Sequence, residues 1–370
     1  MTCMLINRQD VRLSLVVSLA LMSLPVLAQP PAQRLQRALP AMMDSAAIPA
    51  VSIALIENGQ ISWSEGIGLK DKITKQPVSA ETIFRGASLG KPIFAYAVLK
   101  LSQQGQIDLD TPLLNYVPHG YVQTQFLKGP MQDEQIALIT ARMVLNHTSG
   151  LPNWRTEGKP LMTLFTPGSR YSYSGEGYYL LQMVVEHIVK QPIEAFMQQS
   201  VFSPLRMSHT SYVYQPADSL AYACSYDGAG KPVTNEIEVA NVAHTLRTTA
   251  ADYARFVIAA MMQPEPVSIT LTTLLSSQVQ TDICQPGQIG WGLGIAIQHT
   301  AKGDLFCQWA KSPSASGYVI GSPSQRKAVI YLTNVTNQGL RVGERIVALS
   351  LTYADPLFSC FGVRPYNARP

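Results

Sequence analysis

Ser88-Leu89-Gly90-Lys91 places a serine three residues before a lysine at the start of an apolar run. Residues at positions i and i+3 lie on the same face of a helix, so the lysine amine can reach the serine hydroxyl. A serine hydroxyl is a strong nucleophile only when a neighbouring base takes its proton, and a lysine with a lowered pKa can be that base. The segment predicts an acyl-transfer nucleophile, Ser88, activated by Lys91; the alternative is a helix-capping serine.

The residues that follow distinguish this pair from a second serine–lysine spacing at Ser324 and Lys327. After Ser88 the apolar residues recur at helical spacing, and Gly105 stands where a helix would end; these residues are Ile93, Phe94, Ala97, Val98 and Leu101. Ser324 instead follows a Gly-Ser-Pro segment and precedes a strand-like run, which predicts a turn between two strands.

The order of the predicted elements indicates one sheet built from both ends of the chain. Asn58-Gly59 between two apolar runs predicts a β-hairpin over 51–56 and 61–65. Further strands are expected over 292–298, 305–310, 317–321 and 327–334, and helices over 177–190, 249–262 and 342–353. Strands at both ends with helices between them predict an α/β (α+β type) domain with an inserted, mostly helical subdomain at approximately 105–265.

The N-terminus has the pattern of a secretory signal peptide. Arg8 and Arg12 precede an apolar run that is too short to span a bilayer, and a small-residue site predicts cleavage after Ala28. We therefore expect a signal peptide over 1–28, a single domain over 29–370, export to the periplasm or the medium, and no transmembrane anchor after cleavage. The mature chain keeps four cysteines, whose disulfide pairing the sequence leaves open; they are Cys224, Cys284, Cys307 and Cys360.

Composition and charge exclude some other classes of function. The formal net charge of +4 falls to +3 without the signal peptide, which is too weak to favour a nucleic-acid partner. The histidines and cysteines do not have metal-site spacing, and no glycine-rich phosphate loop is present. We therefore interpret His147 as a structural residue. The sequence implies no metal or organic cofactor.

Five segments in this order resemble the serine β-lactamase and penicillin-binding-protein superfamily, nearest the class C β-lactamase-like hydrolases. The segments contain Ser88 and Lys91, Gly105 to Asp110, His147 to Leu151, Tyr171 to Gly175, and Thr248 to Phe256. The resemblance covers about residues 40 to 350. It implies the β-lactamase/transpeptidase-like fold, in which a central antiparallel sheet is flanked by helices.

The resemblance also implies the other site residues. The family's second motif falls on Tyr173, a proton-transfer group, with Gly175 where asparagine is usual. Its third motif falls on Gln308-Trp309-Ala310, where the usual cation is replaced by a neutral amide and the usual glycine by alanine. The backbone N–H groups of Ser88 and Lys311 would form the oxyanion hole, where each donor supplies about 3 kcal/mol. Strand alternation would point the Lys311 side chain away from the face of Ala310.

These residues predict an exported serine hydrolase that forms an acyl-enzyme on Ser88, with Lys91 and Tyr173 transferring protons. Gly175, Gln308, Trp309 and Ala310 would contact the substrate, a small molecule or peptide, with cell-wall fragments among the candidates. The altered third motif favours an esterase or an atypical D-amino-acid peptidase. The alternatives are a catalytically impaired penicillin-binding-like protein that binds cell-wall-type ligands and, third, a β-lactamase.

Overall fold

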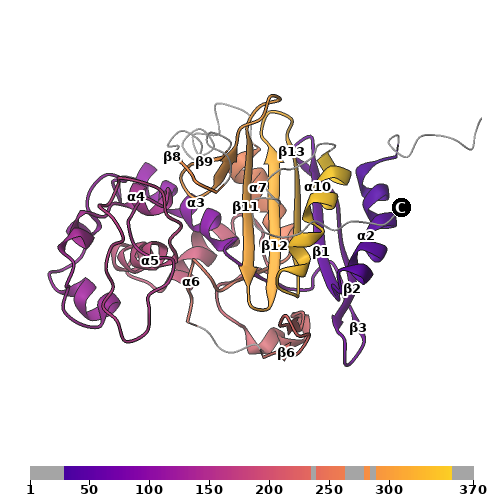
Figure 1. The fold of residues 1–370 in the computed structure, drawn as a ribbon, viewed down its shortest axis with the longest axis horizontal. Helices are drawn as coiled ribbons and strands as arrows, with labels where there is room; N and C mark the ends of the chain where they lie inside the picture. The colour runs from indigo at the N-terminus through magenta and orange to yellow at the C-terminus, as the bar shows by residue number, and fades with distance from the viewer. Residues whose placement is uncertain (1–28, 235–238, 263–278, 284–288, 352–370) are drawn as a thin grey trace, which may run out of the picture.

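The computed structural model describes residues 29–234, 239–262, 279–283 and 289–351, which form a nine-stranded antiparallel sheet with helices on both faces (Figure 1). The strand order is β3-β2-β1-β13-β12-β11-β10-β9-β8. The bounds of these strands are β1 Ala50–Glu57, β2 Gln60–Asp71, β3 Gln76–Pro77, β8 Val279–Gln280, β9 Ile289–Trp291, β10 Ala296–Gln298, β11 Leu305–Ser312, β12 Ala315–Ser322 and β13 Lys327–Thr333. Because β1 pairs with β13, the N-terminal and C-terminal parts of the chain close one sheet, as the sequence predicts.

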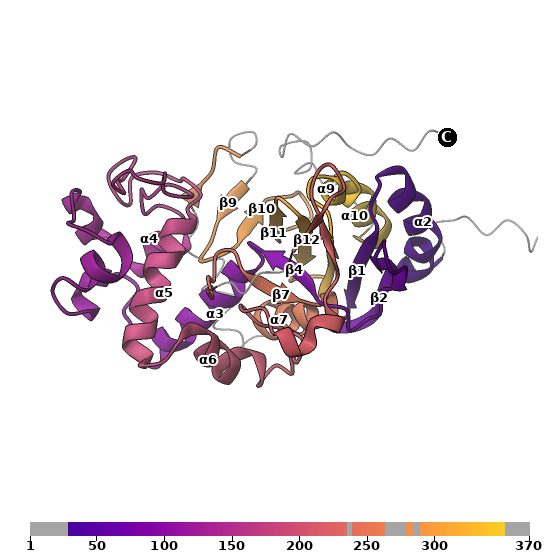
Figure 2. The same ribbon diagram turned by 90° about the horizontal axis from the view of Figure 1, so that it is seen from below.

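Helices cover the two faces of the sheet separately (Figure 2). On one face, α2 (Pro31–Ser45) contacts β2 and α10 (Gly343–Leu351) contacts β13. On the other face, α7 (Ala250–Met261) packs against β1, β2 and β13. The remaining helices are α3 Gly90–Gln103, α4 Ala141–Leu145, α5 Gly175–Val189, α6 Ile193–Met197 and α9 Gln338–Arg341.

The central strands read as continuous apolar runs because both faces of the sheet are buried. Along β13, Val329 and Tyr331 join the core beneath α2 and α10, whereas Ile330 and Leu332 join the core around α3 and α7. Two small sheets complete the fold, one of β4 (Phe84–Ala87) with β7 (Leu246–Thr248), the other of β5 (Ser225–Tyr226) with β6 (Pro232–Val233).

Two local sequence signals are confirmed by the backbone. Asn58 and Gly59, with φ of 54° and 73°, form the turn between β1 and β2, because a tight hairpin turn needs left-handed residues. At the end of α3, Gly105 has a φ of 71° and its N–H donates to Ser102 O at 3.0 Å. The N–H of Gln106 donates to Leu101 O at 2.9 Å, which completes a Schellman cap.

Three predicted elements have different bounds in the structure. The strand expected over 292–298 is wrong over its first half, because Gly292 donates its N–H to Ile295 O at 2.9 Å and the chain turns there between β9 and β10. The C-terminal helix expected over 342–353 corresponds to α10, which begins at Gly343, and a separate short helix that was not predicted, α9, precedes it. Helix α5 begins at Gly175, before the predicted start, because Ser174 caps it through a 2.9 Å bond from the N–H of Gly177.

Some predictions concern residues beyond the described ranges. The signal peptide over 1–28 lies outside the described residues, as do Cys284 and Cys360. Within the described residues, no helix is long and apolar enough to cross a membrane.

Candidate active site

A pocket of about 280 Å³ opens above Ser88, at the junction between the sheet and the helical region. Its walls come from the start of α3, from the two loops around 153–154 and 244, and from the end of β11. The lining residues are Ser88, Asn153, Trp154, Tyr173, His244, Trp309, Lys311, Ser312 and Pro313. The pocket thus contains four of the residues predicted for the site, which are Ser88, Tyr173, Trp309 and Lys311.

Ser88 lies in the sharp turn between β4 and α3. The preceding residue, Ala87, has a φ of 43°, in the left-handed region that residues other than glycine rarely adopt. Such strain is held only where the surroundings fix the backbone, and it often occurs at functional sites. Ser88 is partly exposed to the pocket, while Leu89 and Gly90 on the following turn are buried.

Lys91 lies directly beneath Ser88. Its Nζ is 3.2 Å from Ser88 Oγ and donates to Ala243 O at 2.8 Å. The side chain is buried, and burial lowers its pKa, although the charge of Tyr173 and a hydrogen bond to it act in the opposite direction. Among the described residues, no carboxylate forms an ion pair with Lys91. The lowered pKa increases the fraction of Lys91 in the neutral form, which is the form that can accept a proton.

Tyr173 completes a cluster with the serine and the lysine. The Nζ atom of Lys91 lies 4.9 Å from the centroid of the Tyr173 ring. From the sheet, Gln308 Nε2 approaches Tyr173 Oη at 3.4 Å and the backbone O of Ser88 at 3.5 Å. The tyrosine hydroxyl is thus placed between the Ser–Lys pair and β11, where it can pass a proton to or from either side.

His147 supports the tyrosine from below. It is fully buried, and its ring lies 4.2 Å from the Tyr173 ring at an angle of 32°. Its Nδ1 accepts the N–H of Ser174 at 3.0 Å. Burial, and then the charge of Lys91, hold the pKa of His147 well below its usual value. The histidine is therefore neutral and fixes the backbone next to Tyr173. The sequence predicted a structural residue here, and the structure adds that this residue positions Tyr173.

The third-motif residues divide between the two faces of β11. Gln308 and Ala310 are fully buried on the face toward α3 and do not line the pocket, whereas Trp309 and Lys311 alternate to the opposite face and do line it. Within the described residues, β10 pairs with β11 only as far as Cys307. The predicted oxyanion donor Lys311 lies beyond the residues of β11 that pair with β10, near the end of the strand.

Gly175 lies under the loop that precedes α5 and is not a pocket-lining residue. A Cβ atom at this position would come within 2.8 Å of both Asn153 O and Trp154 Cη2. The space that a side chain at this position would need is thus occupied by the Asn153–Trp154 loop.

The lining and supporting groups that sequence reasoning missed include Trp154, His244 and the backbone O of Ala243. A signal for Trp154 was present, because a tryptophan three residues after the His147–Leu151 segment is a large aromatic side chain in a loop. The other two had no local signal, since their role depends on a loop that contacts α3 only in the folded chain.

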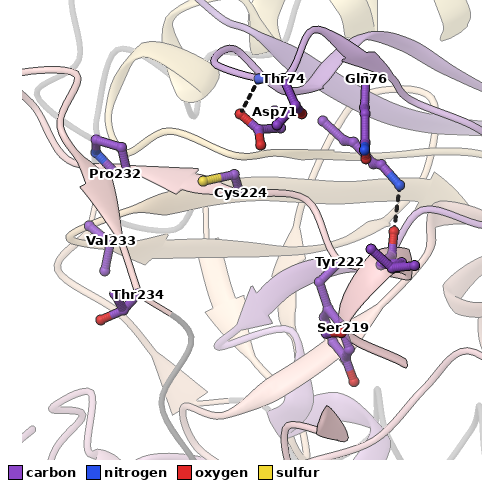
Figure 3. A pocket seen from close by; sticks show the side chains of 11 residues that line it. Asp71, Thr74, Gln76, Ser219, Tyr222, Cys224, Pro232, Val233 and Thr234 are labelled. Carbon is purple, nitrogen blue, oxygen red and sulfur yellow. Dashed lines mark hydrogen bonds between the residues drawn. The ribbon is translucent and has the colours of Figure 1, made fainter. Parts of the chain in front are cut away.

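A second pocket, of about 360 Å³, lies between the β2–β3 hairpin and the 219–234 segment (Figure 3). Lys70 Nζ donates to the backbone O of Leu220, and Asp71 Oδ1 accepts the N–H groups of Ile73 at 2.7 Å and Thr74 at 3.3 Å. Lys70 is thus paired with the 219–234 segment and Asp71 with its own β2–β3 turn. The lining residues include no pair of a nucleophile with a buried base, so the chemistry is assigned to the Ser88 pocket.

Comparisons with known proteins identify the family of the chain. The profile of the Beta-lactamase family matches residues 35–352. Protein flp of Staphylococcus aureus (strain NCTC 8325 / PS 47) is 22% identical over 311 residues, which cover 79% of this chain and 60% of flp. Esterase EstB of Burkholderia gladioli is 30% identical over 224 residues, covering 52% of this chain and 54% of EstB. The match therefore spans less than two thirds of either relative.

Solved structures share the fold at low sequence identity. The Beta-Lactamase/D-Alanine Carboxypeptidase from Pseudomonas syringae has a TM-score of 0.73 at 19% identity, over 88% of this chain and 99% of that one. The octameric penicillin-binding protein homologue from Pyrococcus abyssi has a TM-score of 0.71 at 20% identity, over 87% and 77%. The fold and the family profile lead to the same assignment: the chain belongs to the Beta-lactamase family, a family of serine hydrolases.

Proposed function

We propose that this protein hydrolyses an ester or amide through an acyl-enzyme on Ser88. The observation that carries the proposal is the 3.2 Å contact between Ser88 Oγ and the buried Nζ of Lys91. A lysine that is buried without a carboxylate partner among the described residues is an effective base. The resemblance of the second motif supports Tyr173 as the second proton-transfer group.

The reaction proceeds in two steps. In the first, neutral Lys91 takes the proton of Ser88 Oγ, which attacks the carbonyl carbon, and backbone N–H groups of Ser88 and Lys311 bind the oxyanion. The bond to the leaving alcohol or amine then breaks, and that group takes a proton from Tyr173 or Lys91. In the second step, water loses a proton to the same groups and attacks the ester carbonyl, and Ser88 leaves with its proton restored.

The surroundings of the cluster favour a substrate without a carboxylate. Gln308 contributes a neutral amide where the resemblance leads us to expect a cation, and its Nε2 is already bonded to Trp309 O at 3.2 Å. The relative named Esterase EstB supports an ester as the substrate. The neighbours named D-alanine carboxypeptidase support an amide or peptide as the alternative.

Pre-steady-state hydrolysis of p-nitrophenyl esters tests the proposal. We expect a burst of p-nitrophenol equal to the enzyme concentration, followed by slower turnover, and no burst from Ser88→Ala. A burst of the same size in Ser88→Ala would overturn the assignment of the nucleophile.

The altered positions Gly175 and Gln308 give a specific reason to keep a second candidate. The buried Gln308 amide donates to the backbone O of Ser88 and to Tyr173 Oη. These bonds would hold Ser88 and Tyr173 in an arrangement that binds a ligand without acylation. In this case the protein binds cell-wall-type ligands without turnover. Equilibrium binding of a penicillin without an acyl adduct on Ser88, and no ester burst, would favour this function.

A further inference from the structure

Trp154 lines the Ser88 pocket, but the proposed reaction gives this residue no role. Trp154 is 46% exposed, which is unusual for so large an apolar residue. Its ring meets the His244 ring edge-on, with centroids 5.8 Å apart and an angle of 76°. An exposed tryptophan that is held in place at a pocket is typical of ligand recognition.

The residues on either side of Trp154 are fixed to the start of α5. Asn153 O accepts the N–H groups of Gly175 at 3.0 Å and Glu176 at 3.1 Å. Arg155 donates its backbone N–H and its Nε to Glu176 Oε1, both at 3.0 Å. Glu176 is only 3% exposed, so this ion pair is far less screened than a surface pair. The loop therefore holds Trp154 in one position.

Gly175 allows the indole to pack closely against the helix. Trp154 Cη2 and Cζ2 lie 2.8 and 2.9 Å from the place that a Cβ at Gly175 would occupy. Real Cβ atoms do not come so near to another atom, so a side chain at this position would displace the indole from the pocket wall. The glycine and the tryptophan thus form one structural unit.

Two further aromatic residues, Tyr173 and Trp309, also line the pocket. Trp309 stacks on Tyr173 with ring centroids 6.3 Å apart and an angle of 24°, and Trp291 contacts it edge-on. The described residues that line the pocket include no carboxylate and one lysine, Lys311, which is exposed. A pocket whose lining includes Trp154, Tyr173 and Trp309 accepts a flat apolar group, because aromatic rings gain from stacked or edge-on contact.

We propose that Trp154, held by the Glu176–Arg155 pair and packed on Gly175, is a specificity-determining residue that binds a flat aromatic group next to the scissile carbonyl. The proposal rests on the proposed hydrolase function and names its substrate class, an aryl ester or amide. The aromatic group is carried either on the acyl side or on the leaving-group side of the carbonyl.

Two ester series test the proposal. In one the leaving group is constant and the acyl group is benzoyl or the similarly sized hexanoyl; in the other the acyl group is acetyl and the leaving group is phenol or hexanol. We expect wild-type kcat/KM to favour the aromatic member in at least one series. Trp154→Leu should reduce this preference by about tenfold, whereas Trp154→Phe should keep most of it. The series that responds identifies the side that carries the ring.

The Glu176→Gln variant tests the positioning of the loop. It should raise KM for the aromatic ester several-fold with little change in kcat, because it loosens the loop without touching Ser88 or Lys91. Leu220→Ala, at an exposed leucine of the second pocket, is the matched control and should leave both constants unchanged. An aromatic preference that is the same in wild type and Trp154→Leu would overturn the proposal while leaving the hydrolase function intact.

Binding measured without turnover separates the proposed hydrolase function from the proposed aromatic site. In the Ser88→Ala background, calorimetry with phenyl acetate and with methyl benzoate should show binding that Trp154→Leu weakens by about tenfold. If the ester burst is absent but this binding is present, the hydrolase function fails and the aromatic site stands. If neither ester binds, the aromatic site is wrong whatever the burst shows.

Discussion

At the scale of single residues, Lys91 decides how the site responds to pH. Burial lowers the pKa of Lys91 from the ordinary lysine value, so its neutral form appears at lower pH than in water. We expect the rate of acyl-enzyme formation to rise with pH, with a midpoint below about 10.4. Lys91→Arg should reduce the rate by about 10²–10⁴-fold at all pH values, because a guanidinium cannot accept the proton. Stopped-flow burst rates measure both effects, and a pH-independent rate in wild type would contradict them.

The same buried amine affects stability. Because the pKa is lower in the folded chain, the unfolded chain binds the extra proton between the two values, and the free energy of unfolding falls as pH drops from about 10.4 to the folded pKa. Lys91→Met should therefore be more heat-stable than wild type near about pH 6, and this advantage should shrink as pH approaches about 10.4. Thermal unfolding at several pH values checks this; a constant difference between the variants would mean that the charge of Lys91 is not the cause.

At the scale of helices and strands, features that depend on adjacent residues were predicted better than features that depend on contacts between distant segments. The turn at Asn58-Gly59 and the cap at Gly105 depend on a few adjacent residues and appear as predicted. The 292–298 strand failed because its two glycines permit the turn that separates β9 and β10. The role of Ala243 could not be predicted, because it depends on a contact with α3 across the fold.

The N-terminal caps of α5 and α7 offer a matched pair of variants. Ser174 Oγ accepts the N–H of Gly177 at 2.9 Å, and Thr249 Oγ1 accepts the N–H of Asp252 at 3.1 Å. Ser174→Ala and Thr249→Ala should each destabilise the protein by about 1 kcal/mol. Only Ser174→Ala should also slow the burst, because Ser174 is adjacent to Tyr173 and its Oγ also donates to Pro152 O at 2.9 Å. Equal effects of both variants on the burst would show that α5 does not position the site.

At the scale of the whole molecule, the sheet joins the two ends of the described chain. β1 lies between β2 and β13 and is buried along almost its whole length. Its amides should exchange with solvent only through global unfolding, at the same rate as those of β13, while those of the edge strand β3 exchange faster. Hydrogen exchange read by mass spectrometry tests this; β1 exchanging independently of β13 would contradict a single cooperative sheet.

The fold could be predicted from the sequence, because several segments that resemble the family occur in the family's order along the chain. The substrate class could not be predicted in this way. The pocket takes its walls from segments around 154, 244 and 309, which are far apart in sequence. Gln308 and Ala310 are buried behind the pocket rather than in it, a distinction that depends on the face of β11 that each residue occupies.

The most direct test of an activated Ser88 is intact-mass analysis of the folded protein after exposure to a fluorophosphonate. Wild type should gain the mass of one phosphonyl group, and Ser88→Ala should gain none. No adduct on folded wild type, or an equal adduct on Ser88→Ala, would contradict the assignment of Ser88 as the nucleophile.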